Sequence, residues 1–376
     1  MTNTNPIDEI CQIESNDSLH EHGGAHGNKG NDFARFWLIN ELISLQKNGI
    51  SDYLYLLEYV QDIARFDVED KPSSVILYQL KKKDNSTWTH SNLTGITSKK
   101  LSIDQKLPIP KLLSSVLSFK ELNASAEFVS NARFSVKLAT ENASTSLDYL
   151  PLSDMCTQHK AIIETDIATL HNIGIEAVPM NKVALRHAAI EVDDMRNHII
   201  GIAYMFLKEI SLEHAGQAES FVDALFVKLA SASRHTSKCL TWNELVTKRG
   251  YGKKQFEKDL MALKALPDQH NQRIKLLEEL REIFKWHVRD VLKIEIALNE
   301  LLTTKLSTGS IQMYKFNSVQ LDTINAKALE YKWSVEKEFN EVLDFLSKEL
   351  PDETISKIQA LTIYLMVDAW TNQIYA

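Results

Sequence analysis

The sequence predicts an α+β (or α/β) N-terminal domain with the element order αβββαβ, followed by an all-α C-terminal region. Between residues 32 and 138, segments with helical spacing of apolar residues are interspersed with short apolar runs rich in aromatic and β-branched residues, which are typical of strands. After about residue 151, apolar residues follow helical spacing in nearly every segment. The 376 residues suffice for two hydrophobic cores, so we expect two domains.

The first predicted helix covers residues 32–46. Its apolar residues recur at the spacing of an amphipathic helix, and Asn48 and Gly49 provide a stop signal. Residues 1–27 before it are polar and acidic, and we expect them to form a flexible lead-in.

Strands are predicted at residues 52–60 and 74–80. Both runs are apolar, aromatic and β-branched, and the turn-rich segment 67–73 separates them, so we expect adjacent strands buried on both faces. A helix over residues 108–117 and a further strand over residues 127–138 complete this domain.

The helical region, residues 151–376, has its longest predicted helix at residues 272–306. Apolar residues recur there at steps of three and four. Such a seam could be a coiled coil or a groove for a partner, but it is more often the inner face of a helical bundle.

Composition predicts a soluble cytoplasmic protein. Apolar residues make up 44% and charged residues 24%. No stretch reaches the ~18 apolar residues of a membrane span, and the N-terminus lacks the apolar segment of a secretory signal. Cys11, Cys156 and Cys239 are far apart, with neither zinc-finger nor disulfide-framework spacing. The net charge of −8 excludes a uniformly basic surface for nucleic acid.

Asp62, Gln79 and Lys81 form the candidate catalytic set. Gln79 and Lys81 are two residues apart in a predicted strand, so their side chains project from the same face. Burying an amide and an ammonium on an otherwise apolar strand is costly unless a charged group lies opposite, and Asp62 can supply that group.

Phosphodiester hydrolysis requires a hard cation, a nucleophilic water and a group that positions the water. Asp62 would bind Mg²⁺, Gln79 would add its side-chain carbonyl oxygen, and Lys81 would orient the water and stabilise developing charge. Mn²⁺ is the expected substitute for Mg²⁺. Glu58 is a candidate second acidic ligand, and the choice between Glu58 and Asp62 as the principal acid stays open, with Asp62 ranked first. Because Gln79 replaces a more usual acid, we expect a weaker hold on the metal.

An acid followed by Gln-x-Lys also occurs by chance, and Lys81 could simply belong to an exposed run with Lys82 and Lys83. The context favours function, since a helix precedes the two strands and a helix and strand follow, which is the order of the PD-(D/E)xK nuclease core. Lys82 and Lys83 are then candidate contacts to DNA phosphates.

Residues 27–33, Leu57-Glu58, Asp62, residues 78–81 and Trp88-Thr89 resemble the double-stranded DNA endonuclease domain of CBASS effectors of the Cap-four kind. This PD-(D/E)xK domain is similar to the N-terminal part of Lamassu nuclease subunits. The resemblance implies that residues 28–150 cut double-stranded DNA with Mg²⁺, as the effector of a bacterial anti-phage or anti-plasmid system.

A CBASS effector of this kind would carry a mixed α/β nucleotide-sensing domain, whereas residues 151–376 are predicted to be helical. The resemblance therefore favours the Lamassu (Ddm-type) branch. It implies a complex with an SMC-type ATPase and a small accessory subunit, in which the helical region docks the nuclease and keeps it inactive until triggered. It also implies a homo-oligomer in the active state.

Two alternatives remain open. A catalytically silent assembly subunit would have little reason to keep Asp62, Gln79 and Lys81 together. A stand-alone restriction-like DNA or RNA nuclease would need a target-recognition domain, and none is evident in the sequence.

Overall fold

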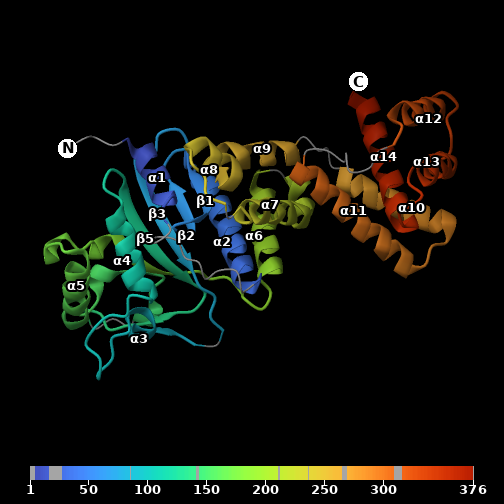
Figure 1. Cartoon of the computed structure of the whole chain (residues 1–376). Helices are drawn as coiled ribbons and strands as arrows, with labels where there is room; N and C mark the ends of the chain where they lie inside the picture. The colour runs from blue at the N-terminus through green and yellow to red at the C-terminus, as the bar shows by residue number, and fades with distance from the viewer. Residues whose placement is uncertain are drawn as a thin grey trace. The chain divides into compact units, whose positions relative to one another are not determined.

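The computed structural model describes residues 5–16, 28–84, 86–140, 144–210, 212–235, 237–264, 269–308 and 316–375. The chain divides into two compact units (Figure 1). Unit 1 comprises residues 1–199 and 228–257, and unit 2 comprises residues 200–227 and 258–376. Unit 1 contains the mixed α/β fold, and the described residues of unit 2 that lie in regular elements are helical.

A seven-stranded mixed sheet in the order β7-β8-β5-β3-β2-β1-β9 forms the centre of unit 1. Its strands β1, β2 and β3 are successive and antiparallel, whereas β3, β5 and β8 run parallel, and β7 and β9 pair antiparallel at the two edges. The bounds are β1 Leu54–Tyr59, β2 Gln61–Phe66, β3 Ser74–Leu80, β5 Asn123–Ser130, β7 Tyr149–Pro151, β8 Val183–His187 and β9 Gly250–Gly252; a separate parallel pair joins β4 (Trp88–Thr89) to β6 (Phe134–Ser135). The predicted mixed class of the N-terminal region is confirmed.

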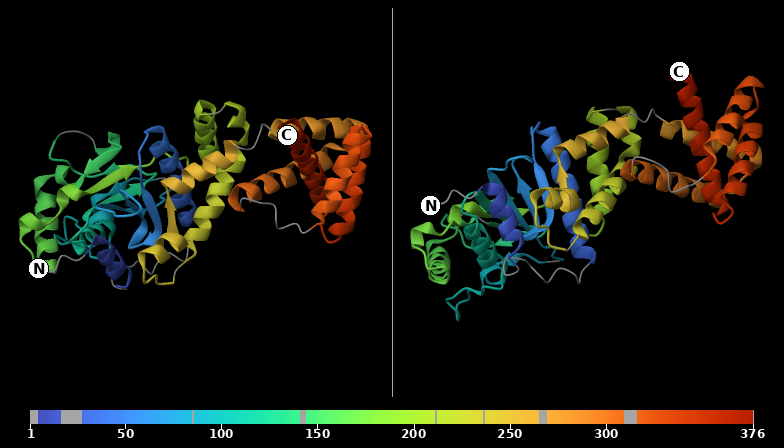
Figure 2. Two further views of the ribbon diagram at one scale, coloured as in Figure 1. Left: turned by 90° about the horizontal axis from the view of Figure 1, so that it is seen from above. Right: turned by 45° about the horizontal axis from the view of Figure 1, so that its top comes forward.

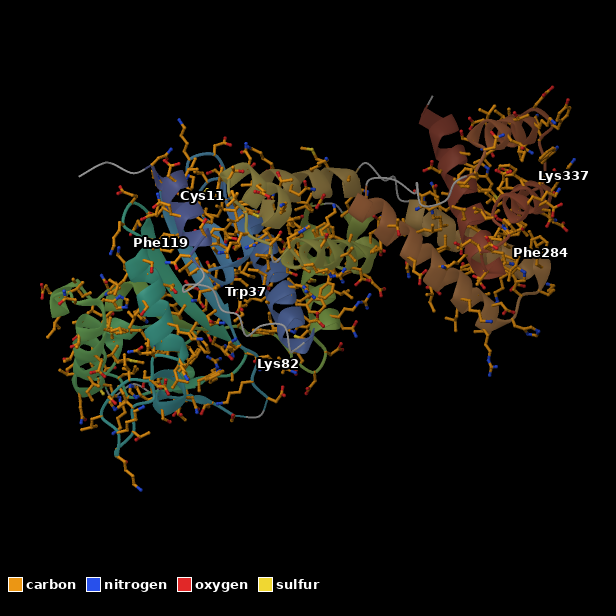
Figure 3. The ribbon with its side chains drawn as sticks, viewed as in Figure 1. Cys11, Trp37, Lys82, Phe119, Phe284 and Lys337 are labelled. Atoms are coloured by element: carbon orange, nitrogen blue, oxygen red, sulfur yellow. The ribbon has the colours of Figure 1, made fainter. Side chains whose placement is uncertain are left out.

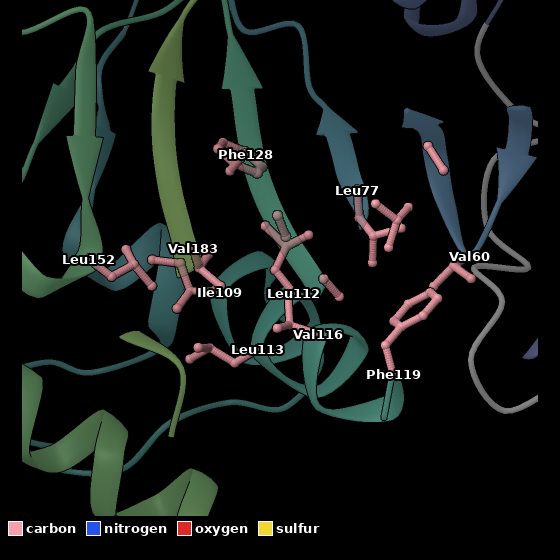
Figure 4. Close-up of a cluster of buried hydrophobic side chains, with 14 of the residues drawn as sticks. Val60, Leu77, Ile109, Leu112, Leu113, Val116, Phe119, Phe128, Leu152 and Val183 are labelled. Carbon is pink, nitrogen blue, oxygen red and sulfur yellow. The ribbon is translucent and has the colours of Figure 1, made fainter. Parts of the chain in front are cut away.

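Helices α2 (Asn28–Lys47) and α4 (Pro108–Ser118) cover opposite faces of this sheet. The ring of Trp37 in α2 lies 4.8 Å from the ring of Tyr78 in β3. The preceding strand residue, Leu77, belongs instead to a buried core with Leu112 and Val116 of α4 (Figure 4). Because successive strand residues point to opposite faces, the two contacts assign one helix to each face. The predicted helices at 32–46 and 108–117 are confirmed.

One predicted neighbour relation is wrong. The segments expected as adjacent strands, now β1 and β3, are separated by β2, which pairs with both. Only Val60 lies between β1 and β2, so the reversal is too tight to leave a turn signal in the sequence. Strand β2 also carries Asp62 and Arg65, which interrupt its apolar pattern.

The expectation of a flexible lead-in over residues 1–27 is wrong for α1 (Pro6–Glu14). Asn5 caps this helix, its side chain accepting from the Ile7 N–H, and Pro6 stands in its first turn. Ile10 is fully buried in the core of unit 1. In a helix of only nine residues, stability comes from the packing of Ile7, Ile10 and Ile13 against this core rather than from intrinsic helix propensity. Residues 1–4 and 17–27 lie outside the described part of the chain.

The sheet continues past residue 150, where only helices were expected. Strand β8 pairs along β5, and β9 pairs along β1. The expectation fails for these segments because β8 has five residues and β9 three, too few to display an alternating pattern. The strand predicted at 127–138 is β5, which begins and ends earlier, followed by the short β6.

Unit 2 is built around a bundle of α10 to α14 (Figure 2). The predicted helix over 272–306 is two helices, because Lys285 adopts a left-handed backbone (φ 51°). Its apolar seam forms part of the bundle core, as in Leu280 and Leu298. At this break the ring of Phe284, which is labelled in Figure 3, lies near that of Trp286. The two rings are stacked, with their centres 5.5 Å apart. The helix bounds not yet given are α3 His90–Thr94, α5 Thr157–His171, α6 Met195–Ile210, α7 Ala218–Ser233, α8 Trp242–Arg249, α9 Lys253–Lys264, α10 Gln269–Phe284, α11 Val288–Thr308, α12 Ser318–Glu330, α13 Val335–Glu349 and α14 Ile355–Tyr375.

Among the described residues, no helix is both long enough and apolar enough to span a membrane.

Candidate active site

The candidate site lies where the β1–β2 turn meets the end of β3. Pairing of Leu57 with Ile63 continues towards the turn, which brings Glu58 level with Asp62. Pairing of Ile63 with Tyr78 likewise brings Asp62 level with Gln79 on the neighbouring strand. Three of the residues singled out in the sequence therefore lie in one row across three strands.

Asp62 is held by two donors from β3. One carboxylate oxygen, Oδ2, accepts from Gln79 Nε2 at 2.8 Å and from the Leu80 backbone N–H at 2.6 Å. The backbone pairing of β2 with β3 ends at Ile63 and Tyr78. Beyond it, the Leu80 N–H donates to the Asp62 carboxylate instead of to a backbone carbonyl of β2. Hydrogen bonds to a charged acceptor are short and strong, and they fix the carboxylate at the strand end.

Gln79 is 1% exposed. A buried amide requires hydrogen-bond partners, and Asp62 provides one, as the sequence analysis expected of a charged group opposite this position. The atom that faces Asp62 is the amide nitrogen, whereas the metal role predicted for Gln79 uses its oxygen. Without a cation, an amide next to a carboxylate is most stable with its nitrogen towards the carboxylate, because the nitrogen can donate a hydrogen bond and the oxygen cannot.

Glu58 stands in an unusual backbone conformation. Its φ is 55°, and that of Val60 is 59°, so two residues with side chains occupy the left-handed region within one turn. Each such residue costs about 1–2 kcal/mol, and such conformations persist where the surroundings enforce them, often at functional sites. The Glu58 carbonyl accepts from Arg249 Nη1 at 2.9 Å, which is one such restraint.

Glu58 is also electrostatically coupled to the other site residues. Burial, and to a lesser extent the negative charge of Asp62, raise the pKa of its carboxyl group to about 7. The positive charges of Arg35, Arg249 and Lys81 act against this increase in pKa. A half-buried pair of carboxylates surrounded by cations is the result.

Lys81 follows β3 directly and is half-buried. Its backbone N–H donates to the Val129 carbonyl at 3.0 Å, which continues the parallel pairing of β3 with β5 by one residue. The strand register therefore fixes the position from which its side chain starts. Together with the electrostatic effect on Glu58, this brings Glu58, Asp62, Gln79 and Lys81 to one place.

Lys82 and Lys83 lie in the loop after Lys81, where Lys82 is labelled in Figure 3. Lys82 Nζ forms an ion pair with Asp84 at 3.0 Å. Lys83 Nζ donates to the Thr87 carbonyl at 2.7 Å and lies 4.6 Å from the centre of the Trp88 ring. Both lysines are therefore engaged within their own loop.

Two arginines of the site were missed by sequence reasoning. Arg35 of α2 donates to Asp32 and to Ser233, both at 3.0 Å, and its charge acts on Glu58. Arg249 of α8 reaches Glu58 from far along the chain. An isolated arginine in a helix has no local signature, so only the tertiary fold identifies either one.

The donor set fits a hard cation. Among the described residues there is no group of three or more His, Cys, Asp or Glu side chains arranged to hold a metal ion. The site instead offers two carboxylates and an amide, which are the oxygen ligands that Mg²⁺ accepts alongside water. Burial and, second to it, repulsion from Asp62 raise the pKa of Glu58, and a divalent cation would act against both by stabilising the charged carboxylate. Asp62, Glu58 and, after its amide turns over, Gln79 are the residues that could hold it.

Comparison with known proteins gives one finding. A family model described as "Cap4, dsDNA endonuclease domain" matches residues 22–233, more than half of the chain. The matched stretch includes all four candidate residues, but neither α1 nor α8 with β9. No curated protein and no solved structure matches the chain.

Proposed function

The chain belongs to the family of Cap4 double-stranded DNA endonuclease domains, and from this premise we propose that it cuts DNA at the site formed by Asp62, Gln79 and Lys81. An endonuclease is a hydrolase, so the second reactant is water. The observation that supports this site most strongly is the hydrogen bond from Gln79 to Asp62, which joins the acid and the Gln-x-Lys segment across two strands.

The proposed cofactor is Mg²⁺, with Mn²⁺ as a substitute. Asp62 and Glu58 would hold the ion, with the side-chain oxygen of Gln79 as a further ligand. When bound, the cation would neutralise charge on the scissile phosphate and lower the pKa of the attacking water. Because the site offers only two acids and an amide as ligands, we expect little of the protein to hold Mg²⁺ when the ion is scarce. The fraction with bound Mg²⁺ should rise when a DNA phosphate adds a further ligand.

The side chains have distinct proposed roles. Lys81, held beside Glu58 by the strand register, orients the attacking water and stabilises charge on the phosphate oxygens. Asp62 is kept in a fixed rotamer by its two donors from β3. Glu58 must lose its proton to act as a ligand, which its pKa of about 7 permits near neutral pH.

Lys82 and Lys83 are proposed to contact DNA phosphates. Their loop begins next to Lys81, which favours this role. Lys82 would exchange its ion pair with exposed Asp84 for a phosphate, and surface ion pairs of this kind are weak enough for that exchange. Lys83 would have to leave Thr87 and Trp88.

We extend the proposal to the biological setting given by the resemblance. The chain would be the nuclease effector of a bacterial anti-phage or anti-plasmid complex of the Lamassu (Ddm) type, acting in the cytoplasm. Residues 28–150 would carry the catalytic residues. The helical region from 151 would dock to an SMC-type ATPase and a small accessory subunit that keep the nuclease inactive until triggered, and the released form would self-associate. The helical bundle of unit 2 supports a docking role.

The test is a plasmid-cutting assay with supercoiled and linear DNA, in Mg²⁺ or in EDTA. Asp62→Ala and Lys81→Ala are compared with wild type and with two matched controls, Asp70→Ala and Lys100→Ala, which change exposed residues of the same types. We expect Mg²⁺-dependent cutting by wild type and both controls, and a loss of about 100-fold or more in both site variants. Equal cutting by all five proteins would refute the site.

A further inference from the structure

Arg249 is a buried cation at the end of α8 with partners in three separate segments. It is 3% exposed. Its Nη1 donates to the Glu58 carbonyl at 2.9 Å, and its Nη2 donates to the Ser237 carbonyl at 2.7 Å. Nη2 also lies 3.0 Å from Oε1 of Glu14, which is 1% exposed and ends α1. One guanidinium therefore joins α1, the segment before α8 and the β1–β2 turn.

The β1–β2 turn needs an external restraint. Glu58 and Val60 both adopt left-handed backbones, which residues with a Cβ avoid in the absence of compensating contacts. The hydrogen bond from Arg249 satisfies the carbonyl of one of these two residues. Strand β9 begins directly after Arg249, and its first residue, Gly250, pairs with Leu56, two residues before Glu58. This pairing positions Arg249 next to the β1–β2 turn.

The partners of Arg249 compensate for the free energy that burying its guanidinium costs. Removing a guanidinium from water is expensive unless a carboxylate and further acceptors are provided. Glu14 provides the carboxylate, and the Glu58 and Ser237 carbonyls provide the acceptors. Glu14 and Arg249 both lie outside the matched stretch 22–233. The restraint on the site thus comes from segments that flank the matched nuclease domain on both sides.

We propose that Arg249 is a positioning residue of the nuclease, which holds the β1–β2 turn so that Glu58 stays beside Asp62, and that Glu14 of α1 keeps the Arg249 side chain in place. The inference rests on the proposed function for its catalytic meaning, but the restraint on the turn is a property of the protein alone. Loss of the guanidinium would leave the Glu58 carbonyl without this donor, and the turn would relax towards ordinary backbone angles.

The first test needs no metal and no DNA. Amide hydrogen exchange over residues 57–63 is measured in the full-length protein in EDTA, for wild type, Arg249→Met and Arg186→Met. Arg186 is the matched control, because it forms an ion pair with buried Glu41 elsewhere in unit 1. We expect exchange in this turn to be about tenfold faster in Arg249→Met and unchanged in Arg186→Met. Equal exchange in all three proteins, or equal acceleration by both substitutions, overturns the proposal.

The second test links the turn to the site. The Mg²⁺ concentration for half-maximal plasmid cutting is measured for wild type, Arg249→Met, Arg186→Met and Arg249→Lys. It is also measured for the single variant Glu58→Gln and for the double variant Glu58→Gln/Arg249→Met. We expect this Mg²⁺ concentration to be about tenfold higher in Arg249→Met than in wild type, with a smaller increase in Arg249→Lys. The double variant should require the same Mg²⁺ concentration as Glu58→Gln alone. An additional rise in the double variant would show that Arg249 does not act through Glu58.

The two tests separate the possible failures. If wild type does not cut DNA, the proposed function fails, and hydrogen exchange alone decides the positioning role. If Arg249→Met does not fold by circular dichroism, Arg249→Lys and Glu14→Gln are measured in its place. Both keep a polar group at the substituted position, and unchanged turn exchange in both overturns the proposal.

Discussion

At the scale of single residues, the site is defined by charges that are held close together. Asp62 and Glu58 lie level on paired strands, and Glu58 has its pKa raised to about 7 by burial and by Asp62. Gln79 takes a position where an additional acid would increase this repulsion, and its amide donates to Asp62 instead. This arrangement holds the Asp62 carboxylate without adding a further negative charge beside Glu58.

Replacing Gln79 with Glu tests this arrangement. Gln79→Glu removes the donor to Asp62 and adds a third carboxylate to the site, at a buried position, so we expect the protein in EDTA to be less stable by about 1–3 kcal/mol. With Mg²⁺ the added ligand should lower the metal concentration for half-maximal stabilisation by about tenfold. Thermal unfolding at several Mg²⁺ concentrations measures both. A variant more stable than wild type in EDTA would contradict the arrangement.

The pKa of Glu58 predicts a pH dependence of folding. Its pKa is raised from 4.5 to about 7, so the folded state binds this proton more tightly than the unfolded state. The contribution to stability is therefore full below the ordinary pKa and is lost as pH rises through about 7. Without metal, Glu58→Gln should be more stable than wild type by about 2 kcal/mol at about pH 8, with little difference at about pH 4.

Urea unfolding of both proteins at the two pH values measures this difference. Parallel pH dependence in wild type and Glu58→Gln would mean that Glu58 titrates near its ordinary pKa.

At the scale of elements, α1 is attached to the nuclease core by two buried carboxylates. Glu14 pairs with Arg249, and Glu9 accepts from the backbone N–H groups of Lys120, Glu121 and Leu122 in the connection from α4 to β5. Lys120 and Glu121 are exposed residues, whereas the N–H group of Leu122 donates to Glu9 in a buried position. A helix that looked like part of a polar tail is therefore a structural component of unit 1.

Glu9→Ala tests the attachment of α1. Removing the acceptor leaves the buried Leu122 N–H and two part-buried N–H groups without their carboxylate, so we expect a loss of about 2 kcal/mol in the free energy of unfolding. Asp8→Ala, an exposed neighbour in the same helix, is the control and should change stability by less than about 0.5 kcal/mol. Equal effects of the two substitutions on urea unfolding would show that α1 is not held through Glu9.

The elements that the sequence predicted are those with a strong apolar pattern. Strands β1 and β3 and helices α2 and α4 satisfy this condition, whereas β2 contains charged residues and β8 and β9 are short. The common face of Gln79 and Lys81 was predictable because two-residue spacing places side chains on one face of a strand. A charged partner for buried Gln79 was predictable from the cost of burying an amide, and Asp62 is that partner. Arg35 and Arg249 were not predictable, since their proximity to Glu58 depends on packing between segments distant in sequence.

At the scale of the whole molecule, the fold of unit 1 includes segments outside residues 28–150, the stretch that contains the proposed site residues. A fragment of residues 28–150 would keep Asp62, Gln79 and Lys81 but lose β8, β9, α1 and Trp242, whose ring lies 5.4 Å from Phe66. Both edges of the central strands would be left unpaired, so we expect this fragment to show no cooperative unfolding transition. Calorimetry of the fragment and the full chain is the measurement, and a cooperative transition in the fragment would contradict this view of unit 1.

The central claim is that the carboxylate of Asp62 is required for cutting DNA. The most direct measurement is the initial rate of supercoiled plasmid cutting in Mg²⁺ by Asp62→Asn, which keeps the shape of the side chain and removes its charge. The control is Asp70→Asn at an exposed position. We predict a loss of about 100-fold or more in Asp62→Asn, with the control unchanged. A rate for Asp62→Asn within about twofold of wild type would contradict the claim.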